Sequence, residues 1–305
     1  MFNVYEQQDR NKRRSLAVMV LFVVFITGVV WVFSQILGYG PGAVGAALIF
    51  AGLISFSSYW WGDKLILAIS KARPANKKED FNFFTVAENL AMVAQIPVPK
   101  LYVIEDSAPN AFATGRDPKH AVVCITRGLL EKLNRTELEG VIAHELSHIK
   151  NFDTRLMSIV TILVGMVTLL ADWSFRGVRF GGKNREEREG NFGAVLFLIG
   201  VILALLSPLI AQLIQLAISR RREFLADASG VMLTRFPEGL AKALEKIAAD
   251  REPLEVANKA TAHLYIINPF KEGISSGPGQ RSWFAGLFNT HPPVEERIKA
   301  LREMR

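Results

Sequence analysis

Long apolar stretches constrain the fold of this chain more than any other feature of its sequence. Residues 16–37, 43–61 and 195–218 contain no charged side chain, and each is long enough to cross a bilayer as a helix. Residues 156–170 form a fourth apolar stretch, which would span about 22 Å as a helix and is short for a full crossing. Half of all residues are hydrophobic, and they gather in these stretches. The sequence therefore predicts a multi-pass membrane protein with about four membrane helices.

The first two stretches are predicted to form a transmembrane hairpin over residues 15–62. A cleaved signal peptide is disfavoured, because the first stretch is longer than the apolar region of a signal peptide and a second stretch follows at once. Basic residues cluster within residues 1–14 and again after the second stretch, whereas none lies in the turn at 38–42. Since lysine and arginine are enriched on the cytoplasmic side, we expect the tail at 1–14 and the other end of the hairpin in the cytoplasm.

The basic residues are also the main argument about partners. The net charge of +7 is compatible with nucleic-acid binding, but the basic residues flank apolar stretches and form no separate basic domain. We therefore assign them to membrane topology, and predict the lipid bilayer and no nucleic acid as a partner. The single cysteine, Cys124, excludes a disulfide within the chain and agrees with a reducing compartment.

The sequence His144-Glu145-Leu146-Ser147-His148 is the strongest chemical signal in the chain. On a helix, residues four positions apart lie on one face, so both imidazoles can bind one metal ion. Zinc is the metal that this spacing favours. Glu145 lies beside the first histidine, where a carboxylate can take a proton from a metal-bound water.

The surrounding sequence predicts a mainly α fold with a small β-sheet. A capping-box pattern at Thr136 and Glu139 indicates where the motif helix begins. Asn151 and Asp153 indicate that it ends soon after the motif, unless Asp153 instead contacts the metal site. A strand beside a metal-binding helix suggests a sheet edge that can hold an extended peptide by backbone pairing. Strands are expected at 101–105 and 121–126, a loop or short strand at 109–115, and helices at 83–98, 128–133, 235–250 and 294–304.

A catalytic zinc site with two histidines needs a third protein ligand. Glu223 and Asp227 stand four positions apart on a predicted helix that follows the apolar stretch at 195–218, so Glu223 is the candidate. A solvated acidic face is the alternative interpretation. If both apolar stretches between His148 and Glu223 cross the membrane, the chain returns to the same side, as a shared metal ion requires. The intervening loop at 173–191 carries five basic residues, which is unusual for an external loop.

Taken together, these residues resemble the HtpX-type family of bacterial membrane zinc metalloproteases, which is related to the CAAX prenyl endoproteases. The resemblance covers nearly the whole chain, and the ordered set of motifs is far more specific than the zinc motif alone. Besides the hairpin and the zinc motif, it includes Asn110-Ala111-Phe112, Glu223 with Asp227, and His291-Pro292-Pro293 with Arg297.

The resemblance implies a gluzincin-like protease domain on the cytoplasmic side of a bacterial inner membrane, with zinc bound by the two motif histidines and Glu223. It implies that Asp227 orients a ligand histidine and that His291 stabilises the oxyanion of the tetrahedral intermediate. Arg297 would be structural or lie near the substrate, and the segment 110–112 would lie along the substrate cleft. The implied role is quality control, in which the enzyme cleaves misfolded or damaged membrane proteins.

The chemistry of the predicted ligand set leads to the same activity. Two imidazoles and one carboxylate leave a zinc ion with an open position for water, whose pKa falls toward about 7. Glu145 would accept a proton from this water and return it to the leaving amine. We therefore predict a zinc endopeptidase with one Zn²⁺ per chain. Its protease domain would be formed by residues 63–155 and 220–305, on either side of the membrane segments within 156–219.

Two other interpretations fit parts of the sequence. An intramembrane metalloprotease would carry the zinc motif inside a membrane helix, but residues 131–137 before the motif are too polar for hydrocarbon. A non-catalytic zinc-binding scaffold or chaperone would not need Glu145, and would usually fill all four metal positions with protein ligands. His120 and His263 show no partners in the sequence and are expected to be ordinary surface or core residues.

Overall fold

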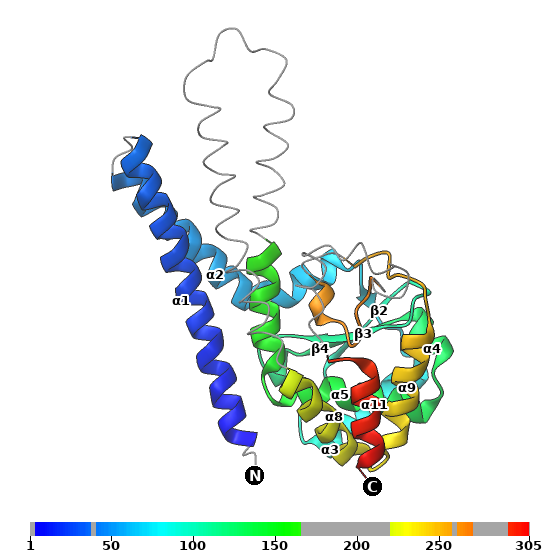
Figure 1. Ribbon diagram of the computed structural model, residues 1–305. Helices are drawn as coiled ribbons and strands as arrows, with labels where there is room; N and C mark the ends of the chain where they lie inside the picture. The colour runs from blue at the N-terminus through cyan, green and yellow to red at the C-terminus, as the bar shows by residue number, and fades with distance from the viewer. Residues whose placement is uncertain (1–3, 38–40, 166–219, 258–260, 271–291, 305) are drawn as a thin grey trace, which may run out of the picture.

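The protein consists of a long helical hairpin and a compact, mainly helical domain (Figure 1). Helices α1 (Val4–Leu37) and α2 (Pro41–Ile69) form the hairpin and extend away from the domain. Helix α1 runs without a break from the polar residues of the predicted tail into the first apolar stretch. The computed structural model describes residues 4–37, 41–165, 220–257, 261–270 and 292–304.

Among the described residues, the hairpin has an apolar surface of the kind that faces lipid in membrane proteins. The segment Val44–Ile69 is long and apolar enough to cross a membrane. Large apolar side chains cover its surface, and Ile49 is 67% exposed. The apolar stretch at 156–170 is helical through residue 165, whereas the stretch at 195–218 lies outside the described residues. One buried apolar cluster joins this helix to the hairpin, and it comprises Val18, Phe22, Ala51, Leu156, Ile159, Val160, Leu163 and Val164.

The domain contains a four-stranded mixed sheet in the order β1-β2-β4-β3. The central strands β2 (Lys100–Ile104) and β4 (Val122–Thr126) are parallel. Strand β3 (Ala111–Thr114) pairs antiparallel with β4, and β1 (Arg73–Pro74) pairs antiparallel with β2. The predicted strands are therefore present, and the segment left open between loop and strand forms edge strand β3.

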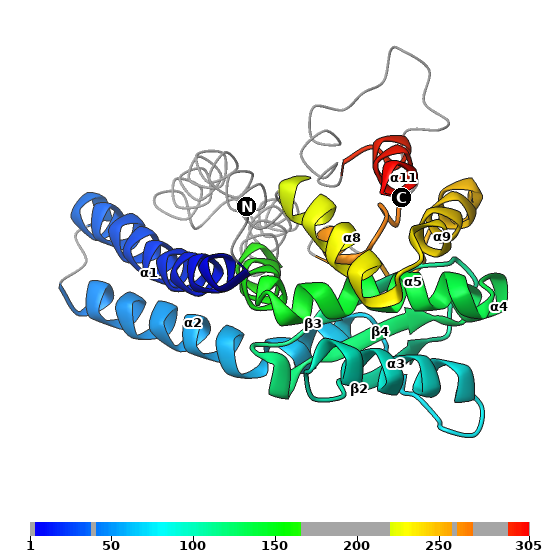
Figure 2. The same ribbon diagram turned by 90° about the horizontal axis from the view of Figure 1, so that it is seen from below.

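Helix α5 (Arg135–Lys150), which carries the zinc motif, runs through the centre of the domain. In Figure 2, the sheet and α3 (Phe81–Ala94) lie on one side of α5, and three further helices lie on the other. All residues from Gly140 to Ile149 are buried. The short helix α4 (Arg127–Lys132) precedes α5, and the three helices on the opposite side are α8 (Arg220–Thr234), α9 (Pro237–Ala249) and α11 (Val294–Glu303).

The start of α5 differs from the prediction. The N-cap is Asn134, whose side chain accepts a hydrogen bond from the backbone N–H of Glu137, while the Glu137 carboxylate accepts one from the N–H of Asn134. The predicted capping box at Thr136 and Glu139 is wrong, because Thr136 lies inside the first turn and donates its hydroxyl to the Asn134 side chain. The helix therefore begins with a capping box of the predicted type, but two residues closer to the N-terminus than predicted.

Two glycines allow helices α8 and α9 to approach α5 closely. A Cβ atom at Gly140 would lie 2.6 Å from the backbone nitrogen of Leu240 in α9. A Cβ atom at Gly230 in α8 would lie 3.1 Å from the backbone nitrogen of His144. These contacts bring the acidic residues of α8 against the histidine face of α5.

Candidate metal centre

Three side chains from two helices converge at one point in the domain. His144 and His148 are one turn apart on α5, and Glu223 comes from the first turn of α8. Their potential ligand atoms all lie within 4.8 Å of one another, and all three residues are buried. The two imidazole rings are nearly perpendicular, with centroids 4.7 Å apart. The folded chain therefore brings together the three residues that the sequence suggested as metal ligands.

The separations between these atoms fit a single tetrahedral metal ion. The Nε2 atoms of His144 and His148 are 3.1 Å apart. The Glu223 carboxylate oxygens lie 3.8 Å from His144 Nε2 and 3.5 Å from His148 Nε2. Two ligands held about 2.0–2.1 Å from zinc in tetrahedral geometry would lie about 3.4 Å apart. Two imidazoles and one carboxylate are also a donor set that suits zinc, so the residues fit this ion.

Each histidine is held by a carboxylate on the side away from the other. His144 Nδ1 lies 2.8 Å from Asp227 Oδ1, and His148 Nδ1 lies 3.0 Å from Asp153 Oδ2. A carboxylate at Nδ1 fixes the Nδ1–H tautomer and leaves Nε2 free to bind a metal. The structure places Asp227 beside His144, and its role in orienting this ligand histidine stays a prediction. Helix α5 ends at Lys150, soon after the motif as predicted, and Asp153 in addition contacts His148.

The surroundings of His148 favour the protonated form of its imidazole ring. Burial lowers its pKa, but the hydrogen bond to Asp153 and the nearby carboxylates of Glu223 and Glu145 outweigh burial and raise the pKa to about 9. A metal ion on Nε2 requires that nitrogen to be deprotonated, so metal binding displaces a proton from His148.

Arg297 closes the site behind His144. It is fully buried and donates two hydrogen bonds to Asp227, of 2.9 Å from Nε and 2.7 Å from Nη2. Its Nη1 atom lies 3.5 Å from the Glu223 carboxylate. Burial raises the pKa of Asp227, but Arg297 and His144 outweigh it, and the net pKa lies below its ordinary value. Arg297 thus holds the Asp227 carboxylate in place and forms an ion pair with that of Glu223.

Glu145 lies on the side of α5 that faces the sheet. Its carboxylate is buried and hydrogen-bonds the backbone N–H of Ala113 in the edge strand β3. Burial is the main reason that its pKa is raised to about 7. A carboxyl group with this pKa exchanges its proton readily near neutral pH, as a general base requires.

The predicted substrate segment 110–112 is largely built into the protein interior. The Asn110 side chain donates to the carbonyl of Ile267 at 3.0 Å, and the Ala111 carbonyl accepts from Ile266 N–H at 2.9 Å. The Phe112 ring is fully buried and packs edge-on against Tyr265. The side chains of this segment therefore anchor residues 262–267, and the neighbouring backbone at Ala113 is the part nearest Glu145.

The other histidines do not join the candidate metal centre. His120 is exposed and lies 2.8 Å from Asp117. His263 is buried, and its Nε2 lies 2.9 Å from the Thr161 hydroxyl. His291 lies outside the described residues, so its predicted place near the oxyanion stays a prediction.

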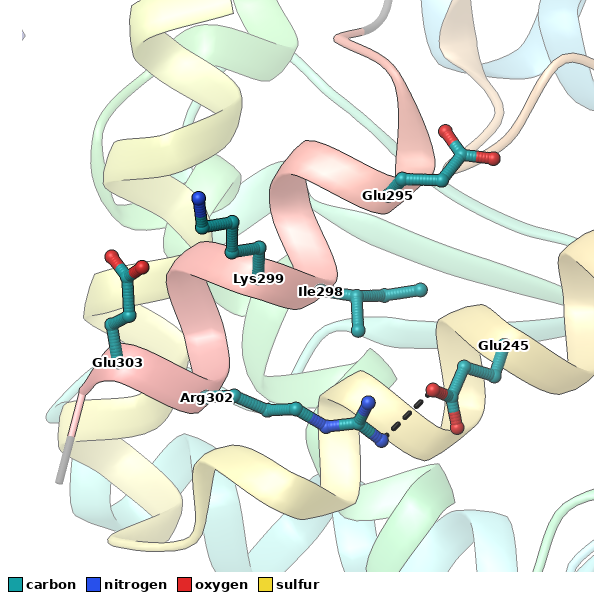
Figure 3. Close-up of a pocket in the computed structure, with 6 residues that line it drawn as sticks. All are labelled: Glu245, Glu295, Ile298, Lys299, Arg302 and Glu303. Atoms are coloured by element: carbon teal, nitrogen blue, oxygen red, sulfur yellow. Dashed lines mark ion pairs between the residues drawn. The ribbon is translucent and has the colours of Figure 1, made fainter.

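A surface hollow between α9 and α11 is separate from these residues (Figure 3). Arg302 crosses it and pairs with Glu245 at 2.8 Å. Its lining is mostly charged and includes none of the candidate metal ligands. The residues that line it are Glu245, Glu295, Ile298, Lys299, Arg302 and Glu303.

Two residues that contribute to the site were not predicted from the sequence. Asn11, near the start of α1, donates a hydrogen bond to Asp153, and Ile266 covers part of the outer edge of β3. Both contacts join segments that are far apart in the chain, and no local pattern around either residue signals them. Only the folded structure reveals them.

Sequence comparisons relate this chain to known proteins. The sequence model of peptidase family M48 matches residues 78–305. The chain is 41% identical to a protease HtpX homolog from Dictyoglomus thermophilum over 99% of this chain and 95% of that protein. It is 43% identical to a protease HtpX homolog from Thermoanaerobacter pseudethanolicus over 99% and 98% of the two chains.

Among solved structures, the crystal structure of S. mikatae Ste24p is similar, with a TM-score of 0.48 and 17% identity over 97% of this chain and 67% of that chain. The family assignment rests on the matches in sequence. The family model covers most of the chain, and the HtpX homologs match it along nearly its full length. The chain therefore belongs to peptidase family M48 and is a membrane metalloendopeptidase of the HtpX type.

Proposed function

We propose that this protein is a zinc-dependent endopeptidase that cleaves misfolded or damaged membrane proteins at the cytoplasmic face of a bacterial inner membrane. The observation that carries the proposal is the convergence of His144, His148 and Glu223 with separations suited to one tetrahedral ion. Glu145 adjoins this set and has a pKa near neutrality, which a structural metal site would not need.

The roles of the side chains follow from their positions. Bound zinc would polarise the scissile carbonyl and lower the pKa of the attacking water. Glu145 accepts the proton of that water and returns it to the nitrogen of the leaving amine. Asp227 and Asp153 keep the two ligand histidines in the tautomer that presents Nε2. Arg297 compensates the negative charge of Asp227 and Glu223 behind the ligands.

The edge strand β3 offers a docking line for an extended substrate. In an antiparallel pair, the main-chain groups of alternate residues point toward and away from the partner strand. The Asn110 carbonyl bonds to β4, whereas the Ala111 carbonyl points outward to Ile266. The N–H of Ala113 bonds to Glu145, so the Ala113 carbonyl points outward as well. We assign it the role of accepting a main-chain hydrogen bond from the substrate, which makes recognition largely independent of side chains.

The arrangement of the membrane segments supports cleavage near the bilayer. Asp153, the partner of His148, is the first residue of the helix that packs with the hairpin through Leu156 and its apolar neighbours. Arg222 at the start of α8 is buried and lies 3.8 Å from Asp153, directly after the apolar stretch 195–218. With four crossings, both halves of the protease domain would lie on the cytoplasmic side. Protease-accessibility labelling in inverted vesicles tests this side.

The decisive experiment is Glu145→Gln in the full-length, detergent-solubilised protein. Zinc should bind at one ion per chain, while cleavage of an unfolded membrane-protein substrate should fall by about 10²–10⁴-fold. Glu139→Gln is the matched control, because Glu139 lies on the same helix and pairs with Arg135 away from the metal ligands. Wild-type cleavage by Glu145→Gln would refute the protease mechanism and favour a non-catalytic zinc-binding scaffold or chaperone.

A further inference from the structure

The N-terminal part of α1 reaches the metal centre through one side chain. Asn11 is fully buried, and its amide nitrogen donates to Asp153 Oδ1 at 2.6 Å and to the Asn151 carbonyl at 2.9 Å. These two acceptors lie in the short turn between α5 and the following helix. A residue of the predicted N-terminal tail therefore holds the segment that directly follows the zinc motif.

The same aspartate holds a candidate metal ligand. Asp153 Oδ2 lies 3.0 Å from His148 Nδ1, while its Oδ1 atom accepts the hydrogen bond from Asn11. The carboxylate thus bridges the amide of α1 and the imidazole of α5. Because the partner at Nδ1 sets the orientation of a ligand imidazole, a restraint on Asp153 is also a restraint on His148 Nε2.

The two candidate ligand histidines are supported by different parts of the molecule. Asp227 behind His144 is fixed by Arg297 of the compact domain. Asp153 behind His148 is held by Asn11 of the hairpin. Arg222 at the start of α8 lies 3.8 Å from the same Asp153 oxygen, so His144 is supported within the domain, whereas His148 is supported by both α1 and α8.

The path of α1 past the turn is defined by packing next to Asn11 and further along the helix. The ammonium group of Lys12 lies 4.6 Å from the centre of the Phe152 ring. Two turns further along, Val18 and Phe22 join the buried apolar cluster of Leu156 and Ile159. These contacts place the Asn11 amide against Asp153. The position requires a short donor: alanine cannot donate, and an aspartate of the same shape would repel the Asp153 carboxylate.

We propose that Asn11 is a positioning residue that couples the docked N-terminal helix to the metal centre through Asp153 and His148. The hairpin then does more than anchor the enzyme, because its docking sets the metal affinity of the site. The inference rests on the proposed zinc centre and adds to it a residue from outside the protease domain.

The test measures zinc affinity rather than activity. Zinc dissociation constants are determined by competition with a chromophoric chelator for the full-length protein in detergent. Loss of the partner of a ligand histidine typically weakens metal binding about 10–100-fold, so Asp153→Ala should lie in this range. Asn11→Ala should weaken zinc binding about 10-fold. The double variant should bind zinc as Asp153→Ala does, because Asn11 acts through Asp153.

Two further variants make the result decisive. Asn11→Asp keeps the shape of the side chain, and should weaken zinc binding at least as much as Asn11→Ala because it places a second carboxylate against that of Asp153. Arg13→Gln is the control, because Arg13 is exposed and lies two residues from Asn11 on α1. It should leave the zinc dissociation constant at the wild-type value. Wild-type zinc affinity in Asn11→Asp would overturn the proposal. So would a result in which Asn11→Ala weakens zinc binding by the same factor in the wild-type background and in the Asp153→Ala background. Failure of the wild-type protein to bind one zinc ion would instead refute the proposed function.

Discussion

Arg297 and Asp227 form a fully buried ion pair with two hydrogen bonds, directly behind the candidate ligand His144. The pair joins helix α11 to helix α8. Arg297 makes a third hydrogen bond, in which its Nη1 atom donates to the Ile266 carbonyl at 3.0 Å. The C-terminal helix is therefore tied to the metal centre and to the segment that covers β3.

This pair predicts a large loss of stability when the arginine is removed. Arg297→Met leaves the Asp227 carboxylate buried without its main partner, and breaking a buried pair in this way typically costs about 3–5 kcal/mol. The melting temperature of the detergent-solubilised protein should fall sharply. Arg302→Met on the same helix is the control, because Arg302 is half-exposed and pairs with surface glutamates. Equal melting temperatures for the two variants would show that the buried pair does not stabilise the fold.

Removal of the metal should lower stability in a way that zinc reverses. A ligand that binds only the folded state stabilises it by about 2.7 kcal/mol at a free concentration one hundred times its dissociation constant. Chelated protein should melt at a lower temperature, and added Zn²⁺ should restore the original value. Mg²⁺, which prefers oxygen ligands, should not do so. Glu223→Gln should gain little from zinc, and a full zinc-induced shift in this variant would exclude Glu223 as a ligand.

The contact between α5 and α9 predicts that Gly140 cannot be enlarged without cost. In Gly140→Ala, the new methyl group would lie 2.6 Å from the backbone nitrogen of Leu240, so one helix must move. Overpacking of this kind typically destabilises a protein by about 1–3 kcal/mol. Gly52→Ala in α2 is the control, because no atom lies within 4 Å of the added Cβ. Thermal unfolding of both variants measures the difference in stability. A wild-type melting temperature for Gly140→Ala would contradict the close approach of α5 and α9.

Asn110 predicts a link between the edge strand and the segment 262–267. Asn110→Ala removes the hydrogen bond to Ile267, and leaves a buried carbonyl without a side-chain donor at a typical cost of about 1–3 kcal/mol. Hydrogen exchange should accelerate at the Ile266 amide, which bonds to Ala111. Asn76→Ala, at a surface turn, should leave this exchange rate unchanged. Unaltered exchange in Asn110→Ala would mean that other contacts alone hold the segment.

The sequence predicted those parts of the site that local spacing encodes. The two motif histidines share a helix face because of their spacing, and Glu223 followed from the need for a third ligand after the last apolar stretch. The start of α5 was misplaced because two overlapping capping patterns lie within six residues, and Asn134 with Glu137 forms the better one. The strand at 111–114 was left open because its residues are small and few.

The remaining parts depend on contacts between distant segments. Asn11 is a polar residue among basic ones, and nothing near it signals a buried partner beyond residue 150. Ile266 lies outside any strand pattern, yet its amide pairs with β3. Arg297 was linked to the site by resemblance to a family, and its ion pair with Asp227 follows only from the packing of α11 on α8. These contacts arise from tertiary packing rather than from local sequence.

The division of the candidate ligands between α5 and α8 has a consequence for biosynthesis. A ribosome makes the two histidines first, and Glu223 follows only after the apolar stretch 195–218 has been made. A nascent chain that ends before α8 therefore carries an incomplete metal centre, as well as His144 without its carboxylate partner Asp227. Arg297, which holds that carboxylate, is made later still. The order of synthesis thus delays a complete metal centre until both apolar stretches between His148 and Glu223 have been made.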